Sequence, residues 1–475
     1  MLSFYNTLTR QVDEFTPQND NKVSLYTCGP TVYSEPLIGN WVAYIRWDTL
    51  VRTLRDAGYD IDRVMNITDV GHLVSDADEG EDKMEKGARR EGKTAWDIAK
   101  IYTDSFIRGM ERLNLLPPEH LVKATDYIDE QIALVKTLEE KGYTYLIGDG
   151  VYFDTSKFPS YGDFARLDLD AQKAGARVEA NPEKRNPSDF ALWKLTPAGT
   201  HRDMEWDSPW GKGFPGWHLE CSAMAMNILG PTLDIHTGGI DHIPVHHTNE
   251  IAQSESASGQ RFANYWLHAN FITVDGTKIS KSLGNGFTLD DIEAKGFSPL
   301  DFRMFVLQSH YRTESNFTWE NLGSAAQRLS RWREIARLRH QTHDTLVDDD
   351  AKDTDPVSVK LLNSLQAAQN SLHDDMNTPE ALRSVEEAFG ELERRNGITD
   401  VSQAALLSLL EWIDATLGLK LLDSTPDITD EAKQLILERQ RAREAGDWSK
   451  SDELRDELNT LGVNVRDTPT GPIWY

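Results

Sequence analysis

The sequence predicts an α/β protein built on a parallel sheet, and three observations support this class. Residues Lys22 to Cys28 form a short apolar run that ends at the turn Gly29-Pro30. A helical repeat of apolar residues starts at Asn40, and Asp62 to Thr68 is a second apolar run. Strand, helix and strand within about fifty residues make a βαβ unit, in which the two strands are parallel.

The helix predicted from Asn40 has one apolar face and a clear end. Trp47, Leu50 and Leu54 recur at helical spacing, and Gly58 stops the run. Ligands of parallel sheets bind at the carboxyl ends of the strands. Since Cys28 and Thr68 both stand at such ends, we expect a site there.

The rest of the chain changes character several times. Short strand-like pieces broken by Gly, Pro and Asn suggest an inserted module from about residue 115 to 207, and a parallel strand returns at Leu233 to His236. Asn270 to Ser280 predicts a hairpin whose Asp275-Gly276 turn is of the primed type. Beyond Pro299 the pattern is mostly helical, with acidic or turn-rich linkers at 348–356 and 423–430.

Length and composition are those of an ordinary multidomain protein. The 475 residues allow two to four domains, with 39% hydrophobic and 27% charged residues. The N-terminus has no apolar run of signal-peptide length, and no stretch approaches ~18 apolar residues. We therefore expect a cytoplasmic protein with no membrane partner.

Charge does not identify a partner. The formal net charge of −27 argues against nucleic acid, because phosphate contacts need Lys and Arg. Binding follows local fields, however, and two basic runs stand out, RLSRWREIARLR (328–339) and RQRAR (439–443). A solvated helix face explains either run at least as well as a nucleic-acid contact does.

Four residues have the chemistry of a zinc site. Cys28 and Cys221 are the only cysteines, and a cytosolic chain is not expected to join them in a disulfide. In PVHHTNEIAQ, a helix would place His246 and Glu250 on one face, although such pairs are usually surface pairs. Two thiolates, an imidazole and a carboxylate can bind zinc tetrahedrally. Spacing alone does not bring them together, and two buried apolar thiols are the simpler alternative.

Eight segments resemble those of cysteinyl-tRNA synthetases, in the order of that family. The resemblance runs from Phe4 to Trp474, and several of the motifs are specific to the cysteine enzymes among class I synthetases. The segments are CGPTVY (28–33), MNITDV (65–70), DFALWK (189–194), FPGWHLECSAMA (214–225), DIHTGGID (234–241), HHTNEIAQS (246–254), KISKSLGN (278–285) and RDTPTGPIW (466–474).

The resemblance implies a class I synthetase architecture. This is an α/β fold with a Rossmann-type parallel sheet and an inserted connective module, followed by an α-helical bundle and a small C-terminal domain. The expected parts are residues 1–114 (first half of the Rossmann catalytic domain), 115–207 (connective insertion), 208–265 (second half, with the zinc ligands), 266–320 (stem-contact region with the KISKS loop), 321–425 (helical bundle that binds tRNA) and 426–475 (small anticodon-recognition domain).

The resemblance also assigns residues to each substrate. One Zn²⁺ per chain would be held by Cys28, Cys221, His246 and Glu250. The cysteine pocket would comprise Gly29, Thr68, Trp217 and His236, with core packing as the alternative for the last two. ATP, with Mg²⁺, would contact Gly39, Asn40, Gly239, Asp241 and Lys281. The catalytic groups would be Lys281, Lys278 and Asn40.

The implied reaction is ATP-dependent activation of L-cysteine to cysteinyl-adenylate and its transfer to tRNA(Cys), by a monomer. Zinc explains how serine is rejected, because a pocket that reads shape separates near-isosteres by only about 1–3 kcal/mol, whereas a thiolate binds zinc far better than a hydroxyl. The alternatives are a cysteine ligase acting on an amino sugar and a catalytically weakened relative that binds without activating. A zinc hydrolase is disfavoured, since no general base is evident.

The chain departs from the family at the class I motif HIGH, which here reads Leu37-Ile38-Gly39-Asn40. Asn40 can still donate a hydrogen bond and cap the helix. Leu37 replaces an imidazole, and losing one charge-assisted donor costs ~10²-fold or more in rate. We therefore expect slow adenylation unless a neighbouring His or Lys substitutes, with His72 as one candidate. Leu37→His should then speed pyrophosphate exchange.

Overall fold

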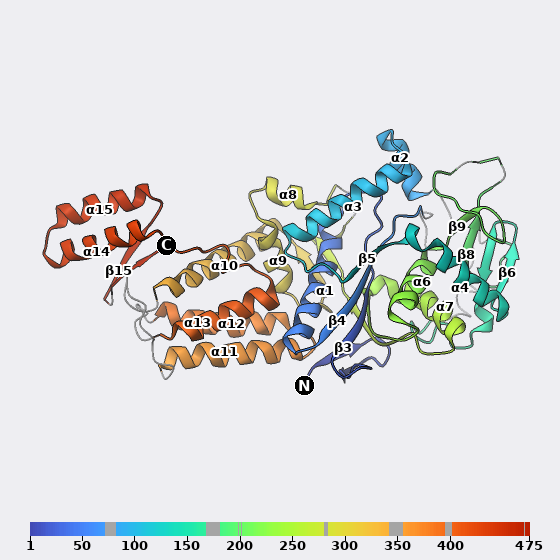
Figure 1. Cartoon of the computed structure of the whole chain (residues 1–475), viewed down its shortest axis with the longest axis horizontal. Helices are drawn as coiled ribbons and strands as arrows, with labels where there is room; N and C mark the ends of the chain where they lie inside the picture. The colour runs from blue at the N-terminus through green and yellow to red at the C-terminus, as the bar shows by residue number, and fades with distance from the viewer. Residues whose placement is uncertain are drawn as a thin grey trace. The chain divides into compact units, whose positions relative to one another are not determined.

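The computed structural model describes residues 1–71, 82–167, 181–197, 199–200, 202–279, 284–341, 355–394, 401–469 and 471–475. The chain divides into two compact units (Figure 1). The first comprises Met1–Asp291 and Tyr311–Asn316, and the second comprises Ile292–His310 and Phe317–Tyr475. Every helix in the described ranges is too short or too polar to span a bilayer.

The first unit is built on a five-stranded parallel sheet with the strand order β11-β10-β3-β4-β5. Its strands are β3 (Lys22–Thr27), β4 (Asp60–Ile67), β5 (His120–Lys123), β10 (Leu233–Gly239) and β11 (Ala263–Ala269). The predicted parallel βαβ unit is confirmed, because β3 and β4 pair in parallel and α1 (Ile38–Asp56) connects them. The strand order reverses between β3 and β10, which is where open α/β sheets bind ligands.

Helix α1 is buried along most of its length. Trp41, Ile45, Trp47 and Leu50 are almost completely shielded from solvent. The chain leaves the helix through Gly58, whose φ of +91° suits glycine. The apolar repeat seen in the sequence is therefore the packing surface of this helix, as predicted.

An antiparallel sheet with the order β6-β7-β8-β9 forms a separate layer in the first unit. Its strands are β6 (Thr144–Ile147), β7 (Gly150–Phe153), β8 (Phe190–Leu195) and β9 (Gly213–Pro215). The hairpin predicted around Asp275-Gly276 is confirmed, because both residues have positive φ, as a primed turn requires. The remaining elements that begin in this unit are β1 (Ser3–Asn6), β2 (Gln11–Glu14), β12 (Ile272–Val274), β13 (Thr277–Lys278), β14 (Ser315–Phe317), α2 (Lys83–Glu91), α3 (Ala95–Arg112), α4 (Ile128–Glu140), α6 (Trp217–Leu229), α7 (Thr248–Ser258) and α8 (Leu289–Ala294).

The second unit is helical, as the sequence predicts beyond Pro299. Figure 1 shows α11, α12 and α13 running side by side, and α11 contacts both of the others. A small C-terminal group packs around Ile436, Leu458 and Trp474. The elements are α9 (Pro299–Leu307), α10 (Trp319–Arg337), α11 (Pro356–His373), α12 (Thr378–Arg394), α13 (Gln403–Trp412), α14 (Asp430–Glu444), α15 (Trp448–Thr460), β15 (Val465–Thr468) and β16 (Gly471–Trp474).

Candidate functional site

A cavity of about 640 Å³ opens at the carboxyl ends of the parallel strands in the first unit. The end of β3, the start of α1 and the end of β10 meet there, so a cavity lies where the sequence predicts a site. The predicted site residues that line the cavity are Cys28, Gly29, Gly39, Asn40, Thr68, Trp217, Cys221, Gly239, Asp241, His246 and Lys278. Five stretches of the sequence therefore contribute to one cavity, at residues 28–40, 68, 217–221, 239–246 and 278.

The four predicted metal ligands lie together, and three of them, Cys28, Cys221 and His246, line this cavity. One ligand atom from each of Cys28, Cys221, His246 and Glu250 lies within 4.8 Å of all the others. Cys28 follows β3, Cys221 is on α6, and Glu250 is on α7. His246 lies in a short π-helical segment, Ile243–His247, which runs directly into α7. The backbone N–H of Cys28 donates to the carbonyl of Thr237, which ties the end of β3 to β10.

A second layer of side chains orients these donors. His246 Nε2 lies 2.8 Å from Glu250 Oε1, while its Nδ1 lies 2.9 Å from His218 Nδ1. The other carboxylate oxygen of Glu250 lies 2.9 Å from His236 Nε2. Glu250 and His236 are both completely buried. Hydrogen bonds on the outer atoms of ligating imidazoles and carboxylates are typical of metal sites.

The electrostatics of the cluster suit a divalent cation. Burial raises the pKa of Cys28 well above its usual value, whereas the hydrogen bond with Cys28 lowers the pKa of Cys221 to about 6. Burial acts to lower the pKa of His246, but Glu250 and Cys221 together raise it to about 10. Burial acts to raise the pKa of Glu250, but His236 and His246 hold it well below its usual range. A metal ion would displace the protons on Cys28 and His246.

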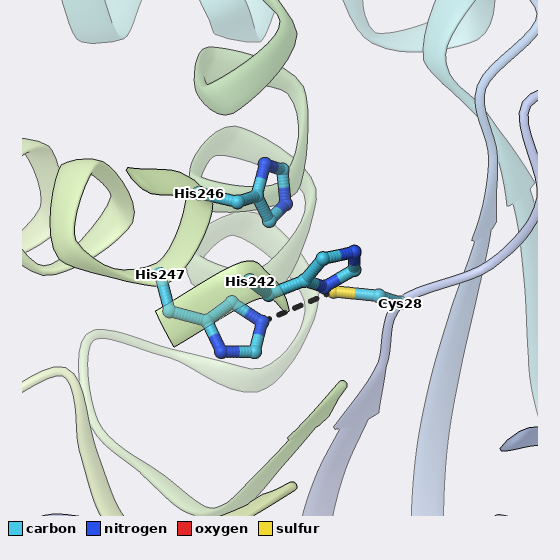
Figure 2. A group of neighbouring side chains, drawn as sticks. All are labelled: Cys28, His242, His246 and His247. Carbon is cyan, nitrogen blue, oxygen red and sulfur yellow. Dashed lines mark hydrogen bonds between the residues drawn. The ribbon is translucent and has the colours of Figure 1, made fainter. Parts of the chain in front are cut away.

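The donor chemistry fits zinc. Two sulfurs, one nitrogen and one carboxylate oxygen form a tetrahedral set for this ion, and the sulfurs disfavour calcium and magnesium. Two further groups satisfy the same distance limit, namely Cys28 with His242, His246 and His247, and Cys28 with His236, His247 and Glu250. Cys28 belongs to all three groups. The first of these alternatives is drawn in Figure 2.

Asn66 joins two of the residues predicted to contact cysteine. Its side-chain oxygen accepts a hydrogen bond from the backbone N–H of Gly29 (2.8 Å), and its amide nitrogen donates to Thr68 Oγ1 (3.0 Å). Thr68 in turn donates to Glu220. Gly29 is required by space, because a Cβ there would lie 1.6 Å from the Asn66 carbonyl oxygen. The ends of β3 and β4 are thus locked together at the cavity wall.

Trp217 is one of several aromatic residues that line the cavity. Its ring centroid lies 4.5 Å from that of His246 and 6.1 Å from that of His242. Trp217 is therefore placed beside the metal donors, at the first position of α6. His236, by contrast, is buried against Glu250 and Trp266, so it acts on the site through Glu250.

The predicted ATP residues that the structure describes line the same cavity. Gly39 and Asn40 are in the first turn of α1, where N–H groups and the helix dipole favour phosphate. The Asn40 side-chain oxygen accepts a hydrogen bond from the backbone N–H of Leu37. Leu37 itself faces Gly286, where a Cβ would lie 3.0 Å from Leu37 Cδ1. Lys281 and His72 lie outside the described residues.

Sequence reasoning missed three residues of the site. Asn66 was within a recognised motif but had no assigned role. His242 and His247 flank His246 at spacings of four and one, a signal that could have been read as additional ligands. Their convergence depends on the π-helical turn, which the sequence pattern did not reveal.

Residues 14–327 match the family model described as "tRNA synthetases class I (C) catalytic domain", and residues 425–474 match the "Cysteinyl-tRNA ligase anticodon binding domain". The curated "Cysteine--tRNA ligase 1" of Burkholderia lata is 46% identical over 474 residues, covering 99% of this chain and 96% of the relative. The "Cysteine--tRNA ligase" of Treponema denticola is 41% identical, covering 100% of this chain and 99% of the relative.

Among solved structures, a Mycobacterium tuberculosis methionyl-tRNA synthetase bound by methionyl-adenylate superposes with a TM-score of 0.60 at 13% identity. It covers 88% of this chain and 94% of that one. A LeuRS–tRNA complex from Agrobacterium radiobacter also gives a TM-score of 0.60 at 13% identity, covering 86% of this chain and 85% of that one. At these identities the likeness establishes the fold, and it confirms the class I architecture.

Proposed function

This chain belongs to the family of cysteine–tRNA ligases, and on that basis we propose that it activates L-cysteine with ATP and transfers it to tRNA(Cys). The observation that carries the proposal is the 46% identity along 99% of the chain, together with a sulfur-rich donor cluster at the end of the cavity. Both substrates would then occupy the one cavity, ATP at the start of α1 and cysteine at the donor cluster.

We propose zinc as the resident metal, held by Cys28, Cys221, His246 and Glu250. Bound there, zinc would supply a soft Lewis-acidic centre that favours the substrate thiolate over the hydroxyl of serine. His218 and His236 hold the outer atoms of His246 and Glu250, so the chain itself fixes the geometry of the donors. Discrimination would then occur during binding, without a second site for editing.

The remaining cavity residues would position the reacting groups. Gly29, Thr68 and Trp217 enclose the space beside the donor cluster, where the amino acid would lie. Gly39 and Gly239 leave room for the nucleotide, with Asn40 and Asp241 as its polar contacts. Lys278 lines the cavity, and with Lys281 and Mg²⁺ it would neutralise the charge that develops on the phosphates.

The C-terminal residues would read the tRNA. The match of residues 425–474 to an anticodon-binding model supports a tRNA partner. The finer division of the chain at residues 114, 207, 265, 320 and 425, the monomeric state and the cytoplasmic location stay predictions. A cysteine ligase acting on an amino sugar is disfavoured, because residues 425–474 match an anticodon-binding model and this chain covers 96–99% of the two curated tRNA ligases.

Two assays test the proposal. Cysteine-dependent exchange of pyrophosphate into ATP reports activation, and charging of a tRNA with the GCA anticodon reports transfer. We expect both, with serine at least about 10³-fold poorer than cysteine, beyond what shape discrimination gives. Exchange without charging would support the amino-sugar ligase, and neither activity would support a silent relative.

A further inference from the structure

We propose that the site offers a metal ion a second set of ligands, Cys28, His242, His246 and His247, in which two imidazoles replace Cys221 and Glu250. This inference rests on the metal of the proposed function and extends it to His242 and His247. The two sets share Cys28 and His246, so an ion could pass from one to the other by exchanging two donors.

The geometry of the four side chains supports a ligand set. One ligand atom from each lies within 4.8 Å of the others. Figure 2 shows the three imidazoles gathered around the thiol of Cys28, with His247 Nε2 3.5 Å from the sulfur. His246 and His247 lie in the π-helical segment Ile243–His247, and His242 is the residue directly before it, so the three side chains come from one short stretch of chain.

His247 is held in the orientation of a ligand. Its Nδ1 lies 2.7 Å from His268 Nε2, and His268 Nδ1 lies 2.7 Å from Thr7 Oγ1. His247, His268 and Thr7 are all buried. This chain of hydrogen bonds fixes the ring of His247 and leaves Nε2 directed at Cys28, as outer hydrogen bonds do for metal-bound histidines.

His242 brings a nitrogen that needs a partner. Its Nδ1 is buried and makes no hydrogen bond to any described residue. Its ring lies beside those of His246 and His247, with centroids 5.0 and 5.1 Å away. A buried polar atom without a hydrogen bond calls for a bound water or ion, and an ion in the second set would satisfy it.

The two sets differ in charge, which gives the second set a distinct chemistry. The first set contributes two thiolates and a carboxylate, whereas the second contributes one thiolate and three neutral imidazoles. A divalent ion would therefore carry a net charge of about −1 in the first set and about +1 in the second. The second arrangement attracts an anionic sulfur more strongly, so a substrate thiolate would favour it over the first.

The test compares zinc binding by variants of the full chain. The wild type, Cys221→Ser and Cys221→Ser/His242→Ala are loaded with Zn²⁺ and passed through a desalting column. Zinc is then counted by mass spectrometry, and Kd is measured by competition with a chromophoric chelator. We expect Cys221→Ser to retain one zinc ion, and the added His242→Ala to weaken binding at least about tenfold, because losing a direct ligand should cost no less than losing an outer-shell partner.

Controls separate the possible failures. Cys221→Ser/His120→Ala, which removes a histidine on β5, should bind zinc like Cys221→Ser. Glu250→Gln provides a second route to the same result if Cys221→Ser does not fold, as judged by circular dichroism. If the wild type binds zinc but both single variants lose it, or if His242→Ala adds no loss, the second set is refuted. If the wild type itself binds no zinc, the metal of the proposed function fails instead.

Discussion

The polar side chains around the cavity and the arginines of the second unit have different roles. In the first unit, several donor atoms converge within 4.8 Å, an arrangement that a cation stabilises. In the second unit, Arg328 and Arg331 of α10 pair with Glu386, and Arg339, in the short 3₁₀ turn after α10, donates to Thr425. The first group is arranged for a ligand, and the second stabilises a helical bundle.

The contrast shows which sequence signals predict function. In the basic run at 328–339, Arg328 and Arg331 are paired with glutamates inside the unit, so the charge of these two arginines gives no evidence for a tRNA contact. In the second basic run, Arg439 is buried against Asp467, and Arg443 pairs with the same carboxylate while lying against the exposed ring of Trp448. Ligand chemistry was a better guide than net charge in both units.

The largest effect is expected at Gly29, where the cavity wall has no room for a side chain. Gly29→Ala would place Cβ 1.6 Å from the Asn66 carbonyl oxygen, so the wall must shift. A shift of about 1 Å at a reaction centre costs about 10²-fold in rate. The rate of pyrophosphate exchange measures this loss. The matched change Gly390→Ala, in the open interior of α12, should instead stabilise the protein by about 0.5–1 kcal/mol. Equal rates of pyrophosphate exchange in the two variants would contradict the account.

A smaller and more selective effect is expected at Asn66. Asn66→Ala removes the hydrogen bonds to Gly29 and Thr68, so these residues lose their fixed positions beside the donor cluster. Loss of about 1–3 kcal/mol predicts a KM for cysteine raised about five- to 150-fold, with the KM for ATP unchanged. Gln131→Ala, at a buried amide remote from the cavity, should leave the KM for cysteine unaltered. An equal rise in both KM values would show a structural role only.

A change at Asp467 tests whether Arg439 has a structural role. Its carboxylate accepts two hydrogen bonds from buried Arg439, and Arg439 holds the pKa of Asp467 below its usual value. Asp467→Asn should lower local stability by about 1–3 kcal/mol, seen as faster hydrogen exchange in α14 and β15, with pyrophosphate exchange unchanged. The contribution is present above the ordinary carboxyl pKa and is lost as pH falls through the lowered value. Hydrogen-exchange rates in the variant equal to those of the wild type would refute the structural role of Arg439.

The smallest effect is expected at Arg331. Arg331→Gln breaks half-exposed ion pairs with Glu386 and Glu393, worth about 0.2–1 kcal/mol. The affinity for tRNA should stay within about twofold of the wild type, because this arginine is paired inside the unit. Glu393→Gln should cause a similar loss of stability in thermal unfolding. A tenfold drop in tRNA affinity with unchanged stability would reverse the comparison between the two units.

Local patterns were enough to predict much of the fold. The βαβ unit, the apolar face of α1 and the Asp275-Gly276 hairpin each follow from periodicity or turn chemistry over a few residues. The family was predicted from motifs spread along the chain, and the comparisons confirm it. The close approach of Cys28 and Cys221 in the donor cluster could not be derived from spacing, because almost two hundred residues separate them.

The finer features of the site depend on three-dimensional convergence. The π-helical turn that gathers His242, His246 and His247 has no periodic signature in so short a segment. Asn66 acquires its role only because the ends of β3 and β4 approach within hydrogen-bonding distance. The expectation that Leu37 slows adenylation stays a prediction, and its packing against Gly286 explains how the position tolerates an apolar side chain.

Metal analysis of protein purified without chelators tests the central claim most directly, with Cys28→Ser alongside the wild type. Since Cys28 belongs to every candidate ligand set, the account predicts one tightly held zinc ion per wild-type chain and almost none in the variant. Ser254→Ala, which removes a buried hydroxyl from α7, should retain the metal. A wild-type chain without stoichiometric metal, or a Cys28→Ser chain that keeps it, would contradict the account.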